Sequence, residues 1–586
     1  MKTFSTPIRW NLNNLQCGLD LEKFKNHLGS IKEKLMEIEI TPNDLNEDKL
    51  VTISSIIKQI ESAESFYYCL TAENIEPSIL TSLKSSILTL KSQVRFIVSN
   101  LQESLSNMNE EQFGEWANGI NQKSFIPELI KDDERGNREK NISSFAREAL
   151  SGLEDIYVQF RDNFKVKVNL SNETNEISFA EANNLAMSHP EPHMRLLVFK
   201  ELNHAIESQL NIFASIYNQM AALRLNENKI KKASYLDESL QLNGISKQTL
   251  NAMWGMVDSN LEDLSKYLKI KASEIGEESL SWHELMTSSE EISRQIKFSE
   301  AINGINKSLE DIDRNIPLFV NGTITKGWID AEIRNTKPTG GFCAPFIPEG
   351  ESRISLSYDN SVDSARRLAH ELGHAWHFYQ MEDIPSLRFS EDNFEMTMAE
   401  TCSIFFETAF IDHLIKDTKD ISTKKAILGS KIERSLNYLM SIRGAYLFEK
   451  RFYESRKKGP LDGNQIEKLS QQCQEIAYGN SLNEYEPFVW IKYGQFYQAE
   501  TPFYNYPYSF GFLLSIGLLE FAKGDKLFHQ KFQGFLSETG VLPLEQLIKK
   551  HFNIVLSQPE FWQQSIERLL ADIEQYRTLM QKVACL

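Results

Sequence analysis

The segment RRLAHELGHAWHFYQ, residues 366–380, contains three of the eleven histidines of this 586-residue chain. His370 and His374 are four positions apart, and His377 follows three positions later. On an α-helix, side chains four positions apart lie on the same face one turn apart, so the first two imidazoles can bind one metal ion. The spacing therefore predicts a helix with a metal site on one face.

Glu371 follows the first histidine and completes the pattern HExxH. In zinc sites of this pattern the metal acidifies a water molecule and polarises a carbonyl group, while the glutamate takes up the proton as general base. The alternative is a chance match on a solvated helix. The pattern predicts zinc-assisted hydrolysis with Glu371 as the base.

A zinc site of this kind needs a third protein ligand and leaves a fourth position open. His377 is one candidate, but it lies two helical turns from His370, so an unbroken helix would carry it past the metal. The other candidate is Glu400 in NFEMTMAETCSIFFETAF, residues 393–410. Glu407, seven positions later on the same helical face, either orients a ligating histidine or makes a structural hydrogen bond.

The composition limits the classes of function. Lys and Arg number 63 and Asp and Glu 81, so the net charge of -18 disfavours nucleic acid and membrane partners. The start of the chain lacks a signal-peptide pattern, and the six cysteines are scattered without a CxxC pair. These features predict a cytoplasmic protein with free thiols, and its length predicts two or more domains.

Most of the chain shows helical periodicity. It is clear in residues 21–40, 77–105, 193–228 and 290–312, and the apolar run at 510–522 predicts a buried helix. Alternation of apolar and polar residues at 166–178 predicts a short hairpin, and we place a domain boundary near residue 185.

The composition changes at residues 321–360, which are rich in Gly, Pro and β-formers. Within them RISLSY, residues 353–358, predicts a strand just before the histidine helix. We expect the substrate cleft in this region, with the edge of RISLSY open to an extended peptide. WHEL at 282–285 lacks a second histidine and is interpreted as structural.

Three stretches together resemble the M3 metallopeptidases, and within them the oligoendopeptidase F group. They are residues 327–377, which end in the histidine helix, MAETCSIFFE at 398–407, and PFYNYPYSFGFLLSIG at 502–517. The start PIRWNLNNL, residues 7–15, is similar too. The resemblance implies that His370, His374 and Glu400 bind one zinc ion per chain and that Glu371 is the catalytic base. Some such sites use the last histidine of HExxHxxH, which makes His377 the alternative third ligand.

Four tyrosines occur close together in GQFYQAETPFYNYPYSFG, residues 494–511: Tyr497, Tyr504, Tyr506 and Tyr508. Peptide hydrolysis needs a donor for the developing oxyanion, although most aromatic residues are packing residues. The resemblance implies that Tyr504 and Tyr508 serve as donors. Many relatives have a histidine where this chain has Gln495, which can donate a hydrogen bond but cannot become positively charged.

We therefore predict a mainly α protein with a helical N-terminal lobe, residues 1–185, and an M3-type catalytic domain, residues 186–586, with a small β element. The resemblance implies a deep channel, with Gly340 and Gly341 in a flexible wall of the cleft, and endopeptidase activity on short peptides. A catalytically weak peptide-binding protein and a metallo-exopeptidase are the alternatives. The sequence leaves peptide length, side-chain preference and oligomeric state open.

Overall fold

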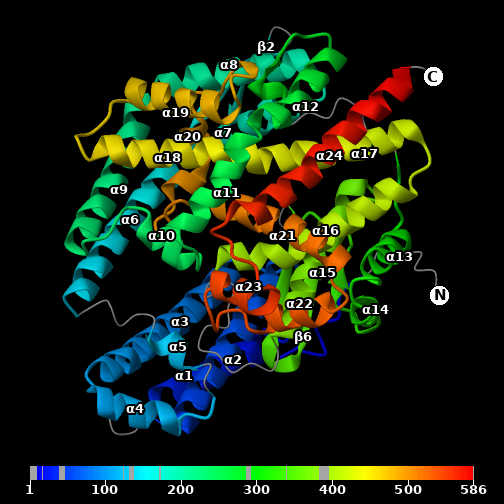
Figure 1. The fold of residues 1–586 in the computed structure, drawn as a ribbon. Helices are drawn as coiled ribbons and strands as arrows, with labels where there is room; N and C mark the ends of the chain where they lie inside the picture. The colour runs from blue at the N-terminus through cyan, green and yellow to red at the C-terminus, as the bar shows by residue number, and fades with distance from the viewer. Residues whose placement is uncertain are drawn as a thin grey trace. The chain divides into compact units, whose positions relative to one another are not determined.

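The computed structural model describes most of the chain (Figure 1). The described residues are 9–15, 17–38, 46–122, 125–130, 137–170, 173–285, 292, 294–337, 340–381 and 395–584. Contacts within the chain divide it into two compact units, each assembled from three segments. Unit 1 comprises residues 1–135, 293–418 and 515–555, and unit 2 comprises residues 136–292, 419–514 and 556–586. The boundary near residue 185 stays a prediction.

Unit 1 contains the predicted metal site and is mostly helical. Its helices are α1 Leu21–Met36, α2 Glu47–Thr71, α3 Pro77–Ser106, α4 Glu110–Gly119, α5 Phe125–Ile130, α13 Phe298–Leu309, α14 Asn315–Thr325, α15 Val362–Gln380, α16 Met396–Asp417, α22 Phe528–Ser537 and α23 Leu544–Phe552. The strands are β4 Ile329–Asp330, β5 Gly341–Phe346 and β6 Glu351–Leu356, with the 3₁₀ turn η3 Ile347–Glu349 between the last two.

Unit 2 contains the tyrosine-rich stretch. Its helices are α6 Asn137–Asn163, α7 Phe179–Ser188, α8 Pro192–Glu207, α9 Leu210–Ile230, α10 Asp237–Leu242, α11 Lys247–Ser259, α12 Leu261–Glu274, α17 Ile421–Leu436, α18 Ile442–Arg456, α19 Gly463–Ala477, α20 Val489–Lys492 and α24 Pro559–Ala584. The short elements are β1 Lys165–Leu170, β2 Glu173–Ser178, β3 Leu280–Ser281, β7 Leu482–Glu484, η2 Trp282–Glu284, η5 Asn437–Ser441 and η6 Gly494–Tyr497. Helix α21, Tyr506–Gly524, passes from unit 2 into unit 1.

The predicted fold class, mainly α with a small β element, is confirmed. The hairpin expected at 166–178 is present as the antiparallel pair β1–β2, with Val166 opposite Ile177. The apolar run at 510–522 lies in α21, where Phe510, Leu513 and Leu514 are buried. Apolar periodicity located these elements because their buried faces repeat at the helical or strand period.

Two stretches of predicted helical periodicity take a more detailed form in the structure. Residues 193–228 form two helices, α8 and α9, separated at Ser208 and Gln209. The helix expected from residue 290 begins only at Phe298 among the described residues, because the Ile296 N–H donates to the Asn360 carbonyl at 2.7 Å and Lys297 has extended dihedral angles. A tertiary backbone hydrogen bond therefore replaces the first helical turn.

The sheet of unit 1 corrects one expectation. Its strand order is β4-β6-β5, with β6 parallel to β4 and antiparallel to β5. The strand RISLSY corresponds to β6, which lies in the centre of the sheet and is paired on both sides. Because β5 pairs along its length and β4 pairs at Ile354 and Ser355, β6 is not an edge strand among the described residues. The edge strands of this sheet are β4 and β5, and β5 packs against the histidine helix.

Candidate metal centre

The histidine segment folds as the long, unbroken helix α15. The Ser361 side chain caps its start by accepting the Ser364 N–H at 3.0 Å, and the helix continues to Gln380. Its buried face packs on β5, β6 and α16, all in unit 1. The apolar residues between the histidines supply this packing, so the sheet and the neighbouring helix hold the histidines in place.

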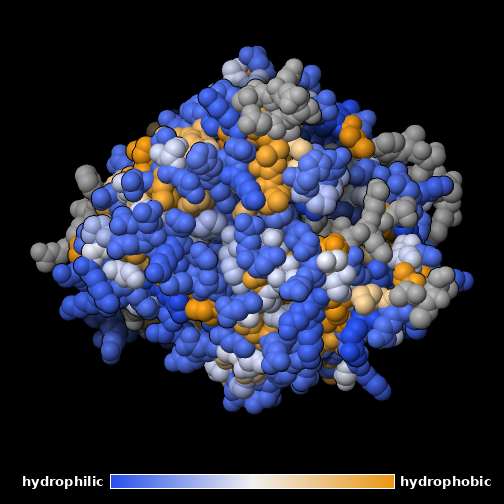
Figure 2. Space-filling model, turned by 90° about the horizontal axis from the view of Figure 1, so that it is seen from above, coloured by the Kyte–Doolittle hydropathy of each residue, from blue (hydrophilic) through white to orange (hydrophobic). Residues whose placement is uncertain are grey.

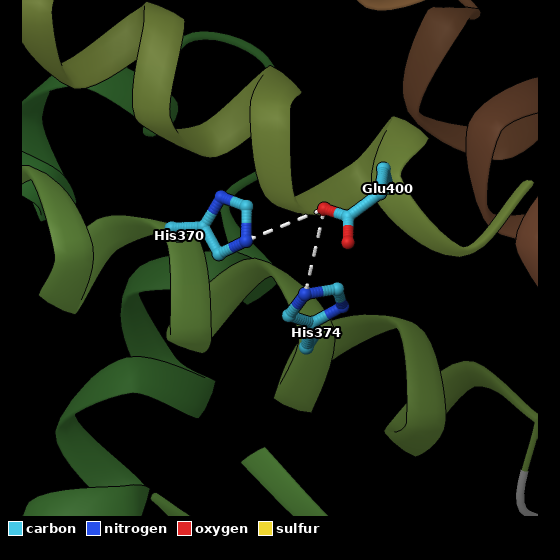
Figure 3. A group of neighbouring side chains, drawn as sticks. All are labelled: His370, His374 and Glu400. Atoms are coloured by element: carbon cyan, nitrogen blue, oxygen red, sulfur yellow. Dashed lines mark ion pairs between the residues drawn. The ribbon is translucent and has the colours of Figure 1, made fainter. Parts of the chain in front are cut away.

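Three side chains meet between α15 and α16 (Figure 3). His370 and His374 extend from α15, and Glu400 extends from the first turns of α16. The Glu400 Oε2 atom lies 3.3 Å from His370 Nε2 and 3.7 Å from His374 Nε2. One ligand atom from each residue falls within 4.8 Å of the others, which makes this a candidate metal site among the described residues.

The geometry of the three side chains fits a zinc ion. Two ligand atoms of a tetrahedral zinc site lie roughly 3.3 Å apart, close to the separations seen here. Three lone pairs that point at one another repel unless a proton or a cation lies between them. Accordingly, hydrogen bonds to Glu400 and Glu407 outweigh burial and raise the pKa of His370 well above its usual value. Burial alone would raise the pKa of Glu400, but the hydrogen bond with His370 and the charge of His374 outweigh it and lower this pKa to about 2.

Further side chains orient the triad. Glu407 Oε2 lies 3.1 Å from His370 Nδ1, which leaves His370 Nε2 facing Glu400. Arg366 Nη1 in turn lies 2.9 Å from Glu407 Oε2. On the other side, the Ser403 hydroxyl donates to Glu400 Oε2 at 2.9 Å. A carboxylate on the far nitrogen of a ligating histidine sets its tautomer and ring direction, so Glu407 has the geometry expected of such a group.

Glu371 lies on the sheet side of α15, and only 6% of its surface is exposed. Burial raises its pKa to about 7, and the positive charges of His370, Arg366 and Arg367 only partly oppose this. A Cβ atom on Gly341 would lie 3.0 Å from Glu371 Oε1, so the first residue of β5 leaves room for this carboxylate. Glu371 is thus a buried group that can take up and release a proton near neutral pH.

His377 lies apart from the triad. The helix does not end early, and His377 is 1% exposed with its Nε2 atom 2.8 Å from Thr539 Oγ1. Burial and the nearby His374 lower its pKa to about 3. Its ring is a neutral, hydrogen-bonded part of the core in this structure.

Gly373, inside the HELGH motif, allows α15 and α16 to approach closely. A Cβ atom there would lie 2.6 Å from Ser403 Cα and 2.7 Å from the Cys402 carbonyl oxygen, far inside normal contact. Any side chain at this position would push the two helices apart. Ser403 also donates a hydrogen bond to Glu400. The glycine at position 373 therefore sets the distance between Glu400 and the two histidines.

The predicted tyrosines belong to unit 2, and they separate into two kinds. Tyr497 is buried and stacks on Tyr157, and Tyr506 is buried with its hydroxyl bonded to Ser239. Tyr504 and Tyr508 are partly exposed, and their hydroxyl oxygens are 3.0 Å apart. The first two are packing residues, and the second two are partly exposed tyrosines whose hydroxyl groups lie next to each other.

Two other predicted features are located as well. Gln495 lies half-buried in η6, close to Tyr497 in sequence. WHEL forms η2, where Glu284 accepts the Ser281 N–H at 2.8 Å, and burial lowers the pKa of His283. This local capping bond agrees with the structural interpretation of the segment.

Sequence reasoning missed Ser403, Gly373 and Arg366, and it placed Gly341 in the wall of the cleft without its position beside Glu371. A glycine inside a helical pattern is a usable signal, since it often has a packing reason, and Gly373 has one. Arg366 has no comparable signal, because Arg367 beside it offers the same charge and only the tertiary contact with Glu407 distinguishes the two.

A mostly helical chain in which an HExxH helix faces a glutamate of the next helix has the donor set of the zinc metallopeptidase class. The model of Peptidase family M3 matches residues 185–568 of this chain. The chain belongs to this family, and the predicted enzyme class, a metalloendopeptidase of the oligoendopeptidase F type, is confirmed.

Individual relatives agree with this assignment. An oligoendopeptidase F homolog of Borreliella burgdorferi is 24% identical over 82% of both chains. The group B oligopeptidase PepB of Streptococcus agalactiae is 20% identical over 67% of this chain and 68% of its own.

Solved structures show the same fold. A crystal structure from Chlamydophila abortus has a TM-score of 0.82 at 19% identity and covers 97% of this chain and 98% of its own. The oligoendopeptidase-F of Enterococcus faecium has a TM-score of 0.68 at 15% identity, with 96% and 98% covered.

Proposed function

We propose that this protein is a zinc-dependent endopeptidase that hydrolyses short peptides. The observation that carries the proposal is the convergence of His370, His374 and Glu400 beside the buried Glu371. Family M3 membership supports peptide hydrolysis, and relatives named oligopeptidase support short substrates. His377 is the alternative third ligand, and its bond to Thr539 argues against it.

In this mechanism, His370, His374 and Glu400 would hold the zinc ion, which would supply Lewis acidity toward a water molecule and the peptide carbonyl group. Glu371 accepts the proton of the attacking water and then delivers it to the leaving nitrogen. Burial raises the pKa of the Glu371 carboxyl group above its usual value, which favours uptake of the proton. Glu407 keeps the ring of His370 directed at Glu400, and Ser403 holds the Glu400 carboxylate from the opposite side.

The edge strand β5 is the proposed partner for the substrate backbone. Among the described strands, β5 pairs with β6 alone, and its first residue, Gly341, lies beside the Glu371 carboxylate. An extended peptide added to this edge would bring a peptide bond close to the proposed base. Because backbone hydrogen bonds are indifferent to side chains, we expect a broad sequence preference.

The hydroxyl groups of Tyr504 and Tyr508 are the proposed donors to the oxyanion, and a channel that admits only unfolded peptides is the proposed limit on substrate size. Both proposals come from the resemblance to the M3 family. The proposed location is the cytoplasm. Within the described residues, the helices are too short or too polar to cross a lipid bilayer, and Figure 2 shows a largely hydrophilic face with small, separate hydrophobic groups.

The test combines metal analysis with peptide digestion followed by mass spectrometry. We expect about one zinc per chain, internal cleavage of short peptides, and no cleavage of a folded protein. Glu371→Gln should keep the metal and lose at least about a thousandfold in kcat, because it removes the base and spares the ligands. Glu300→Gln on α13, which alters the ion pair of Glu300 with Arg294, is the control and should behave as wild type.

Several outcomes would contradict the proposal. Normal turnover by Glu371→Gln would exclude the mechanism. Binding of peptides without hydrolysis would indicate a peptide-binding protein, and release of single terminal residues alone would indicate an exopeptidase.

A further inference from the structure

Phe503, directly before Tyr504, has a left-handed backbone with φ of 57°. Glycine and asparagine enter this region readily, but a bulky side chain does so only when its surroundings enforce it. Phe503 is also 1% exposed, so its ring is part of the core of unit 2. Such strain is often found where the backbone fixes the position of a functional side chain. The side chain next to Phe503 is that of Tyr504, which makes Tyr504 the candidate for such a group.

Two contacts enforce the conformation of Phe503. Its N–H donates to the Oε1 atom of Glu449, which is 2% exposed, at 3.3 Å. Its ring stacks on Tyr453 and Tyr235, with centroids 5.6 and 5.9 Å away. A buried carboxyl group that accepts a backbone N–H and an aromatic stack together outweigh the preference for a right-handed backbone.

The chain is also held before this residue. The guanidinium of Arg224, 5% exposed, donates to the carbonyl oxygens of Gln498 and Ala499 and to the Tyr453 hydroxyl. Glu154 accepts the Ala499 N–H at 2.8 Å. A buried guanidinium needs hydrogen-bond acceptors, and here two of them are carbonyl groups of the segment that leads to the tyrosine.

The chain is held after this residue as well. The Tyr506 hydroxyl bonds to Ser239 at 3.1 Å, and the Ser509 hydroxyl donates to the Tyr438 carbonyl at 2.5 Å. Tyr504 and Asn505 are thus the two residues whose placement depends on the turn at Phe503. If that turn relaxed, the 3.0 Å approach of the Tyr504 and Tyr508 hydroxyl groups would be lost.

We infer that Arg224, Glu449 and the left-handed turn at Phe503 form a clamp that aims Tyr504 and pairs its hydroxyl with that of Tyr508. The three are positioning residues for catalysis. The inference rests on the proposed function, in which these hydroxyl groups stabilise the oxyanion. Because the clamp acts on a group used in the transition state, its loss should lower kcat more than it raises KM.

The principal experiment compares two substitutions of Glu449. Glu449→Gln keeps an oxygen acceptor for the Phe503 N–H, whereas Glu449→Leu removes it. We expect Glu449→Leu to lower kcat about tenfold with KM within about twofold, and Glu449→Gln to stay within about twofold of wild type. Phe503→Gly relieves the backbone strain but removes the aromatic ring that holds the turn in its left-handed conformation, so it should lower kcat in the same way. This second variant keeps the test decisive if Glu449→Leu fails to fold.

A double-mutant cycle separates the clamp from the proposed role of the tyrosines. Tyr504→Phe/Tyr508→Phe should lower kcat, and adding Glu449→Leu to it should change kcat by less than about twofold. An equal fall in both backgrounds overturns the clamp and leaves the tyrosine role intact. Wild-type kcat in the double phenylalanine variant overturns both.

A second readout needs neither metal nor substrate. With 3-fluorotyrosine placed at position 504, the fluorine resonance of the metal-free protein should shift or broaden in Glu449→Leu and Phe503→Gly, and should be unchanged in Glu449→Gln. An unchanged resonance in Glu449→Leu would overturn the inference.

Discussion

The helix pair α15–α16 and the segment that carries Tyr504 hold their functional groups in different ways. In the helix pair, His370, His374 and Glu400 occupy positions dictated by helical periodicity and by the close approach of the helices at Gly373. In the tyrosine segment, Glu449 accepts the N–H of the strained Phe503, and Arg224 donates to the Ala499 carbonyl just before it. The first arrangement tolerates little change, because its elements are rigid and share a packed surface, whereas the second should respond in graded steps.

The largest expected effect tests the ligand set of the helix pair. Glu400→Ala should weaken zinc binding beyond the roughly hundredfold that loss of an outer-shell partner costs, because it removes a ligand. His377→Ala should leave zinc affinity within about twofold, since His377 bonds to Thr539 instead. Chelator competition measures both affinities. Weak binding in His377→Ala with normal binding in Glu400→Ala would reverse the assignment.

The next effect tests the rigidity of the helix pair. Gly373→Ala would place a methyl group 2.6 Å from Ser403 Cα, so α15 and α16 must separate and the triad must open. We expect zinc affinity to fall by about ten- to a hundredfold and the protein to lose about 1–3 kcal/mol of stability.

The matched control is Gly322→Ala in α14, where an added Cβ meets nothing within 4 Å. This change should stabilise the helix by about 0.5–1 kcal/mol and leave zinc affinity unaltered. Thermal melts and chelator competition compare the pair. If both variants bind zinc like wild type, the close approach at Gly373 does not set the site.

A smaller effect concerns the positive charge of Arg366, which pairs with Glu407 next to His370. Arg366→Met removes the cation that lies 2.9 Å from Glu407 and should lower zinc affinity by about tenfold, because Glu407 then orients His370 less firmly. Arg367→Met removes a neighbouring arginine that pairs with Asp363 and should have less than a twofold effect. Similar losses in both variants would mean that only the general charge of α15 matters.

The smallest effect belongs to the tyrosine segment. Burial raises the pKa of Glu449 to about 8, although the charge of Arg224 partly opposes this. The unfolded carboxyl group ionises near pH 4.5, so the stability of the wild type should fall as the pH rises from about 4.5 to about 8. Glu449→Gln does not ionise, and its melting temperature relative to wild type should therefore increase over that range. A constant difference would show that folding does not raise the pKa of Glu449.

The sequence by itself determined the class of the protein and the histidine half of the candidate site. Apolar periodicity identified the helices, and the four-residue spacing placed His370 and His374 on one helical face. These properties are local, since the period of a helix decides which side chains share a face. For the same reason, the two-turn separation of His377 could be judged without a structure.

Tertiary structure decided what depends on the approach of separate segments. Only the fold shows that β6 is the central strand and β5 the edge, because pairing partners can be far apart in the chain. Only the fold separates Arg366 from Arg367, and only the fold shows why Gly373 lacks a side chain. The strain at Phe503 has no local cause either: it exists because Glu449 and two tyrosines, distant in sequence, enforce a turn that a phenylalanine alone would not adopt.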